Sequence, residues 1–423
     1  MVIRHALAIG LLAATVLPAG AELSRAERKV AAAVDARRNA SIDLLARSVD
    51  IPSATENHEG VRKVGELFAA ELRDVGFEAT WVELPAEVNR AGHLVAEHKG
   101  TKGKRILLIG HLDTVLQGES FRREGDRGFG SGSADMKGGD VIIIEALRAL
   151  QSTGALEGRR IIVVMTGDEE KPGSPHETTR AALVDAAKRS DIALAFEGYA
   201  PGTAVTGRRG IADWRLEVTG SQGHSGTIFG EARGSGAIYE ASRILTAFHD
   251  ELREPYLTYN PGIFLGGTDV SLPGGTSAGT ATGKHNVVAR SAIVEGDLRF
   301  LTAAQLESAE AKMREIVGRN LPKTSASITF DTNMPSMAPT DGNRALLRAL
   351  DGVSRDLETG PMAEHDPSKR GAGDISFVAH LVDSLDGLGA AGDGDHAPGE
   401  YAELDELPNL TKRTALLIYR LTR

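Results

Sequence analysis

Cysteine is absent from the 423-residue sequence. Its absence excludes a disulfide framework, a cysteine-ligated zinc site and a cysteine nucleophile. Any metal site must therefore use histidine, aspartate and glutamate. Runs of lysine and arginine are also missing, and the formal net charge is −10. Both features argue against a nucleic acid or an anionic membrane as partner. We expect a small molecule or a peptide instead.

Long apolar runs are missing except at the N-terminus, "MVIRHALAIGLLAATVLPAGAELS". A basic residue, Arg4, precedes an apolar stretch that is short for a bilayer and ends at Pro18. The small residues that follow, ending at Ala21, form the pattern of a signal-peptidase site. The sequence predicts a signal peptide over residues 1–21, export to the periplasm or medium, and no membrane contact after cleavage. An uncleaved membrane anchor is the alternative, which the short apolar run disfavours.

Helical and strand-like patterns alternate from about residue 25 to residue 200. Apolar residues recur three and four apart in 27–49 and 60–76, as in amphipathic helices. Four short apolar runs resemble strands buried on both faces: 93–98, 105–110, 160–167 and 192–197. The alternation predicts an α/β domain with helices on both sides of a sheet. Ligands of such sheets bind beyond the carboxyl ends of the strands.

The pattern changes between residues 211 and 331, where half-exposed strands and two amphipathic helices follow the order β-α-β-β-α-β. This is the order of a ferredoxin-like unit with one open sheet face. Helical patterns return at 345–357 and 412–421. We therefore expect an α/β domain built from 22–210 and 332–423, interrupted by an inserted domain, 211–331. The glycine-rich stretch 265–284 lacks the spacing of a phosphate-binding loop and is expected to be a flexible loop.

Acidic and histidine residues stand just past several of the predicted strands or in glycine-rich turns. They are His111, Asp113, Asp135, Asp168, Glu169, Glu170, Glu197 and His396. Singly, each has an ordinary explanation, because aspartate beside glycine is common in turns and a lone histidine is usually solvated. Together in one crevice, they would repel or desolvate one another unless a cation neutralised them. Two divalent cations that accept nitrogen and oxygen ligands, such as zinc, would satisfy the set.

Six blocks resemble the M20 family of metallopeptidases, in order and with similar spacing: "GHLDTV", "GSGSADMKGG", "GDEE", "FEG", "GHSG" and "GDHAPGE". The family includes glutamate carboxypeptidase, succinyl-diaminopimelate desuccinylase, acetylornithine deacetylase and aminoacylase. The segment "TGDEEKPGS" is most similar to the glutamate carboxypeptidase branch. The resemblance implies a mixed-sheet α/β zinc-peptidase catalytic domain, an inserted ferredoxin-like lid or dimerisation domain, two zinc ions per subunit and a homodimer.

The resemblance assigns five metal ligands. His111, Asp135 and Glu197 would hold one ion, while Asp135, Glu170 and His396 would hold the other. Asp135 would bridge, as a carboxylate with two oxygens can between ions roughly 3.5 Å apart. Cobalt or manganese could replace zinc at such a donor set.

Three further residues receive catalytic roles. Asp113 would orient the imidazole of His111 from the second position of a His-x-Asp pair. Glu169, directly before the ligand Glu170, would take a proton from the attacking water and deliver it to the leaving amine. His224 resembles the family histidine that reaches the partner subunit's site and stabilises the tetrahedral oxyanion. It is preceded here by glycine, where the family usually has serine.

Asn286 and Arg299 match positions at which the family contacts substrate, although Ala289 stands where the asparagine block usually has proline. Other histidines match no block and are interpreted as ordinary: His93, His98, His176, His249, His285, His365 and His380.

The predicted function is an exported dizinc carboxypeptidase that hydrolyses the amide bond to a C-terminal amino acid, with glutamate as one candidate. An N-acyl-amino-acid amidohydrolase is the first alternative. A non-catalytic binding protein on a peptidase fold is the second, but it would typically have lost a ligand or the base. All five ligands and Glu169 are present.

Overall fold

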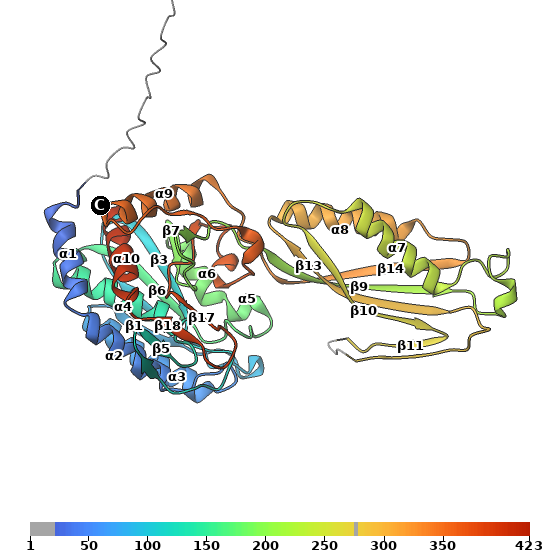
Figure 1. Ribbon diagram of the computed structural model, residues 1–423, viewed down its shortest axis with the longest axis horizontal. Helices are drawn as coiled ribbons and strands as arrows, with labels where there is room; N and C mark the ends of the chain where they lie inside the picture. The colour runs from blue at the N-terminus through green and yellow to red at the C-terminus, as the bar shows by residue number, and fades with distance from the viewer. Residues whose placement is uncertain (1–21, 275–277) are drawn as a thin grey trace, which may run out of the picture.

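A mixed six-stranded sheet forms the centre of the larger body in the computed structural model, which describes residues 22–274 and 278–423 (Figure 1). The predicted signal peptide lies outside these residues. The sheet order is β1 (Glu78–Val82), β2 (His93–His98), β6 (Arg159–Thr166), β3 (Lys102–His111), β7 (Ile192–Ala195) and β16 (Asp383–Leu385). From β6 to β16 neighbouring strands pair in parallel, whereas β2 pairs antiparallel with both of its neighbours. The mixed α/β class predicted from the sequence is confirmed.

Both faces of this sheet are covered, because alternate residues of its central strands are all apolar. Ile106 and Leu108 of β3 point into the larger core cluster, and Leu107 and Ile109 into a smaller one. The larger cluster is closed by α1 (Arg25–Asp35), α2 (Arg38–Val49), α3 (His58–Asp74), α4 (Lys137–Ser152), α9 (Asp341–Asp356) and α10 (Leu407–Leu421). The smaller one is closed by α6 (Ala181–Lys188), which follows the short α5 (His176–Thr179), and by the turn η4 (Asp374–Phe377).

The helical pattern at 27–49 is two helices, since Arg37 leaves helical geometry at φ −108° and ψ 7°. Its guanidinium instead pairs with Glu145 of α4 at 2.5 Å.

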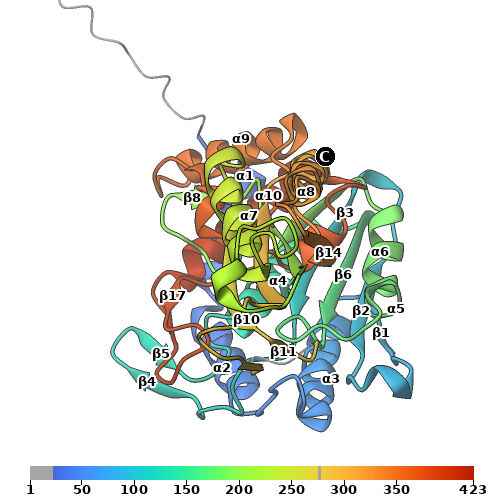
Figure 2. The ribbon, with the colours of Figure 1, turned by 90° about the vertical axis from the view of Figure 1, so that its right-hand side faces the viewer.

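The inserted domain is a four-stranded antiparallel sheet with two helices on one face (Figure 1). Along the chain its elements are β9 (Gly210–Gly220), α7 (Ala237–Glu251), β10 (Thr258–Gly267), β13 (Ser291–Phe300), α8 (Ala303–Gly318) and β14 (Thr324–Met334). The sheet order β10-β13-β9-β14 is that of a ferredoxin-like unit. Figure 2, seen from the end of this domain, shows α7 and α8 on the same side of the sheet. Alternate residues of β9, such as Trp214 and Leu216, are buried beneath the helices, which leaves the other sheet face open.

The glycine-rich stretch expected to be a flexible loop is in part a hairpin, so that prediction was wrong. Strands β11 (Asp269–Ser271) and β12 (Thr280–Thr282) pair antiparallel beside β10. Threonine and valine alternate with small residues there, and β-branched side chains favour extended backbone.

A small sheet of short strands positions the late part of the chain. Its order is β17 (Gly392–Asp393), β18 (Tyr401–Glu403), β5 (Arg127–Phe129) and β4 (Arg122–Glu124). The segment that joins β17 to β18 carries His396 and Glu400. A parallel pair joins β8 (Thr203–Ala204), which precedes the inserted domain in the chain, to β15 (Ala363–Glu364), which follows it. Within the described residues, no helix is both long enough and apolar enough to cross a membrane.

Candidate metal centre

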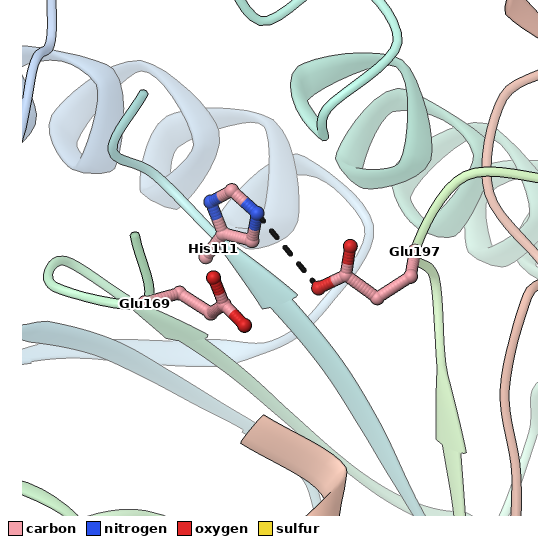
Figure 3. A group of neighbouring side chains, drawn as sticks. All are labelled: His111, Glu169 and Glu197. Carbon is pink, nitrogen blue, oxygen red and sulfur yellow. Dashed lines mark ion pairs between the residues drawn. The ribbon is translucent and has the colours of Figure 1, made fainter. Parts of the chain in front are cut away.

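The carboxyl ends of three parallel strands bring the first group of site residues together. His111 is the last residue of β3, Glu169 and Glu170 follow β6, and Glu197 follows β7. Figure 3 shows the carboxylates of Glu169 and Glu197 approaching the imidazole of His111 from two sides. One donor atom from each of these three residues lies within 4.8 Å of the other two. The sheet edge therefore gathers them as its topology predicts.

Asp135 lies between two imidazoles and presents one oxygen to each. Its Oδ1 is 3.2 Å from Nε2 of His111, and its Oδ2 is 3.1 Å from Nε2 of His396. Glu197 Oε1 lies 3.8 Å from the same nitrogen of His111, and Glu170 Oε2 lies 3.0 Å from that of His396. By these contacts Asp135 joins His111 and Glu197 to Glu170 and His396, as a bridging carboxylate would. Donor atoms of His111, Asp135 and Glu170 also lie within 4.8 Å of one another, so the two groups are close together.

The charges of this cluster are unbalanced without a cation. Burial raises the pKa of Glu197 to about 8 and that of Glu169 well above its ordinary value. Hydrogen bonds to Asp135 and Glu170 raise the pKa of His396 to about 11. Although burial opposes it, hydrogen bonds to Asp113 and Asp135 also raise the pKa of His111. Divalent cations would stabilise ionised carboxylates beside neutral imidazoles, and the nitrogen and oxygen donors suit zinc, cobalt or manganese.

Asp113 organises two parts of the centre. The Nδ1 atom of His111 is 3.0 Å from the main-chain oxygen of Asp113 and 3.5 Å from its Oδ1. The carboxylate is fully buried and accepts hydrogen bonds from Thr55 Oγ1 (2.7 Å) and from the main-chain N–H groups of Glu169 (3.0 Å) and Glu170 (3.1 Å). Both the backbone and the side chain of Asp113 therefore lie where they can orient the imidazole of His111, and the side chain also fixes the turn that carries Glu169.

Sequence reasoning missed Glu400, which holds the turn that carries Asp135. Its carboxylate accepts hydrogen bonds from the main-chain N–H groups of Gly132 (2.8 Å), Ala134 (2.9 Å) and Asp135 (2.9 Å). Its position at the end of the block "GDHAPGE" was the available signal.

His93, interpreted as ordinary, is buried, and its Nδ1 accepts a hydrogen bond from the N–H of Gly167.

Asp168 was predicted among the crevice acids but does not face the proposed ligands. It is buried, and its Oδ1 lies 2.6 Å from Nη1 of Arg180. Its Oδ2 accepts from the N–H of Gly173 at 2.8 Å. Asp168 is therefore part of the support behind the site.

The inserted domain separates the remaining three predicted residues. His224 follows β9 and pairs in register with Val287, and the main-chain oxygen of Asn286 accepts from the N–H of Ser225 at 2.9 Å. Arg299 pairs with Ile211, which is the second residue of β9. Because β9 has 11 residues, it spans roughly 35 Å at about 3.3 Å per residue. His224 and Asn286 therefore lie at the far end of the inserted domain, and Arg299 at the end beside the larger body.

Curated relatives align with nearly the whole chain. Carboxypeptidase G2 from Pseudomonas sp. (strain RS-16) is 28% identical over 98% of this chain and 97% of its own length. Succinyl-diaminopimelate desuccinylase from Gluconobacter oxydans (strain 621H) is also 28% identical, over 82% of this chain and 89% of its own.

Solved structures share the fold. Aminopeptidase PepT from Bacillus cereus ATCC 10987 superimposes with a TM-score of 0.71 at 17% identity, covering 91% of this chain and 99% of the other. The YXEP protein of Bacillus subtilis, described as a dinuclear metal-binding peptidase of the M20 family, gives 0.62 at 13% identity, covering 92% and 99%.

The chain also matches the model of a protein family. The model of peptidase family M20/M25/M40 matches residues 107–420, the stretch that contains all five proposed ligands and the whole inserted domain. The chain belongs to the peptidase family M20/M25/M40, whose members hydrolyse amide bonds.

Proposed function

We propose that this protein is a dizinc amidohydrolase that releases a C-terminal amino acid from a small peptide. The observation that carries the proposal is the carboxylate of Asp135, with one oxygen toward each of His111 and His396. A single cation would need only one of these oxygens, whereas two cations explain both.

The residues divide the chemistry between them. Two zinc ions, when bound, would polarise the scissile carbonyl and lower the pKa of the attacking water. His111, Asp135, Glu170, Glu197 and His396 would hold them. Glu169 is free of that task, and its backbone N–H is fixed by Asp113 Oδ1 at 3.0 Å. It would take the proton from the water and carry it to the nitrogen of the leaving amine.

The direction of cleavage follows from the available charges. An aminopeptidase needs a free acid to bind the substrate's ammonium group, but every acid predicted at the centre is committed to metal, orientation, proton transfer or support. Arg299 is instead suited to a carboxylate: its Nε donates to Asp297 Oδ2 at 2.8 Å, and the two terminal nitrogens of a guanidinium can bind a further carboxylate through two parallel hydrogen bonds. We infer that substrates carry a free α-carboxylate on the leaving amine.

Amidation of that carboxylate should lower kcat/KM by about 10- to 100-fold, the range for losing a hydrogen bond to a charged group. The measurement compares free-acid dipeptides with their C-terminal amides. Equal rates would contradict carboxylate recognition. Faster cleavage of substrates with a free N-terminus than of their N-acylated forms would indicate an aminopeptidase.

N-acyl amino acids keep the same carboxylate, so they test the alternative activity. If N-acetyl amino acids are hydrolysed and dipeptides are not, the protein is an N-acyl-amino-acid amidohydrolase. Hydrolysis of neither class would contradict both proposals.

The active unit is proposed to be a homodimer joined through the inserted domain. β9 runs from the larger body into the inserted domain (Figure 1), and His224 follows the end of this strand, Gly220. Large apolar side chains are exposed on the same domain: Phe229 (68%), Tyr239 (56%), Ile238 (42%) and Phe264 (41%). Phe264 belongs to β10, an edge strand of the sheet. An edge strand beside an apolar patch suits a second copy of the chain.

Mixed dimers test this arrangement. A Glu169→Gln chain and a His224→Ala chain, each inactive alone, should regain part of the activity after mixing, because one site of the heterodimer keeps both residues. The heterodimer is verified by differently tagged chains, and remixed wild-type chains are the control. Absence of recovery would show that His224 acts within its own chain or not at all.

A further inference from the structure

His93 is a buried histidine that the proposed chemistry does not use, yet it contacts the segment that carries the proposed base. It is the first residue of β2 and is 1% exposed. β2 runs antiparallel to β6, with Leu94 opposite Met165. This register sets His93 level with Thr166, the last residue of β6. The histidine therefore lies where β6 ends and the turn with Glu169 begins.

The two ring nitrogens of His93 contact the two ends of one segment, residues 167–179. Nδ1 lies 3.2 Å from the main-chain nitrogen of Gly167, and Nε2 lies 2.7 Å from the main-chain oxygen of Thr179. Glu169 lies between these ends. One imidazole therefore ties the start of the segment to its end.

These two partners determine the protonation state of the ring. A main-chain N–H can only donate and a carbonyl oxygen can only accept, so Nδ1 carries the lone pair and Nε2 carries the proton. Burial lowers the pKa of His93, although the charge of Asp168 opposes this shift. A protonated ring would point a second N–H at the N–H of Gly167. His93 is therefore a neutral imidazole with one donor and one acceptor.

Gly167 allows the turn to approach β2 closely enough for this contact. A Cβ atom at residue 167 would lie 2.3 Å from the main-chain oxygen of Gly92, well inside van der Waals contact. Two residues later, the carboxylate of Asp113 accepts the main-chain N–H of Glu169 at 3.0 Å. The backbone of the turn is thus held by His93 at its start and by Asp113 at the base.

We propose that His93 is a positioning residue for Glu169. By accepting the N–H of Gly167, it fixes the peptide two residues before the base and hence the direction in which the Glu169 carboxylate points. The inference rests on the proposed amidohydrolase function and adds to it a residue outside the metal centre. Misplacing a catalytic group by about 1 Å can cost on the order of 10²-fold in rate, so loss of this hydrogen bond should be visible in kcat.

Two substitutions separate the two hydrogen bonds of the ring. Asparagine has an oxygen as many bonds from the backbone as Nδ1, so His93→Asn can keep the bond to Gly167 but loses the one to Thr179. Glutamine has its amide nitrogen as many bonds out as Nε2, so His93→Gln can keep the bond to Thr179 but loses the one to Gly167. His93→Gln should lower kcat by about 10- to 100-fold and change KM by less than about threefold. His93→Asn should keep most of the wild-type kcat.

Zinc content and thermal melting are measured on the same preparations. Both variants should bind as much zinc as wild type and melt at similar temperatures, since each loses one buried hydrogen bond. His98→Gln is the matched control, because His98 ends the same strand and its Nδ1 lies 2.8 Å from the main-chain oxygen of Arg159, away from the turn. It should retain the wild-type kcat.

A double variant shows whether His93 acts through Glu169. In a Glu169→Gln chain the base is already absent, so adding His93→Gln should lower the residual kcat by less than about threefold. If His93 acted independently of Glu169, the two losses would multiply, and that result would contradict the positioning role.

Nitrogen-15 NMR of the histidine rings tests the contact in the wild-type chain. The ring of His93, identified by its absence from the spectra of the two variants, should be neutral at the pH of the assay, with its proton on Nε2. A protonated ring, or a proton on Nδ1, is incompatible with the bond to Gly167 and would overturn the proposal.

The kinetic comparison can also overturn it. Equal kcat in His93→Asn and His93→Gln, or a lower kcat in His93→Asn, would show that the bond to Gly167 does not position the base. Either result leaves amide hydrolysis and the role of Glu169 intact. Failure of the proposed function would instead be the absence of hydrolysis of every free-acid substrate by the wild-type holoenzyme.

Discussion

Glu169→Gln is expected to lower kcat by about 10²- to 10⁴-fold, the usual contribution of a positioned acid or base. Glutamine keeps the shape of the side chain but cannot accept the proton of the attacking water. The site should otherwise persist, because Asp113 holds residue 169 through its backbone N–H, at 3.0 Å. The measurement is kcat on a saturating free-acid substrate, with metal content determined on the same preparation.

Glu177→Gln is the matched control, since Glu177 is an exposed glutamate of α5 in the segment that follows the same turn. It should retain wild-type activity. A Glu169→Gln enzyme within tenfold of wild type would exclude the proton-transfer role. A variant that has lost its metal would assign Glu169 to the ligands instead.

Arg180→Leu should lower the free energy of unfolding by about 3–5 kcal/mol, the range for breaking a buried ion pair by removing one partner. Arg180 is 1% exposed. Its Nη1 lies 2.6 Å from Asp168 Oδ1 and its Nε 2.8 Å from Asp374 Oδ1. Both aspartates are buried, so leucine would leave two uncompensated charges behind the metal centre. Urea denaturation followed by circular dichroism measures the change.

Arg189→Leu serves as its comparison. Arg189, just after α6, pairs with Glu97 and Asp185, but its side chain is 43% exposed. Exposed pairs contribute about 0–1 kcal/mol, so this variant should stay within that range. Equal destabilisation by the two variants would show that burial of the Arg180 cluster does not determine its contribution.

The ends of the central strands could be predicted from the sequence because each end is determined by residues that are neighbours in the chain. Each of β3, β6 and β7 is a continuous apolar run that ends where polar residues begin, and parallel neighbours place those ends at one sheet edge. His111, Glu169 and Glu197 follow from this rule. Asp135 and His396 do not, because a glycine-rich turn and a long hairpin connection place them.

The residues that hold the turns of the site in place were harder to predict from the sequence. Glu400 acts through backbone N–H groups of residues more than 260 positions earlier in the chain, and no periodicity marks such a contact. The short strands β17 and β18, with two and three residues, carry too little pattern to predict. Asn286 and Arg299 were grouped by their family match, and only the register of β13 on β9 shows that they lie at opposite ends of the inserted domain.

Metal content per chain tests the central claim most directly, because the account depends on two cations that share Asp135. Mass spectrometry of the purified protein, after dialysis against zinc, should find two zinc ions per chain in wild type and in Glu169→Gln. Asp135→Ala should lose both the metal and the activity. One ion per chain in a fully active wild-type enzyme, or two ions retained by Asp135→Ala, would contradict the shared two-metal centre.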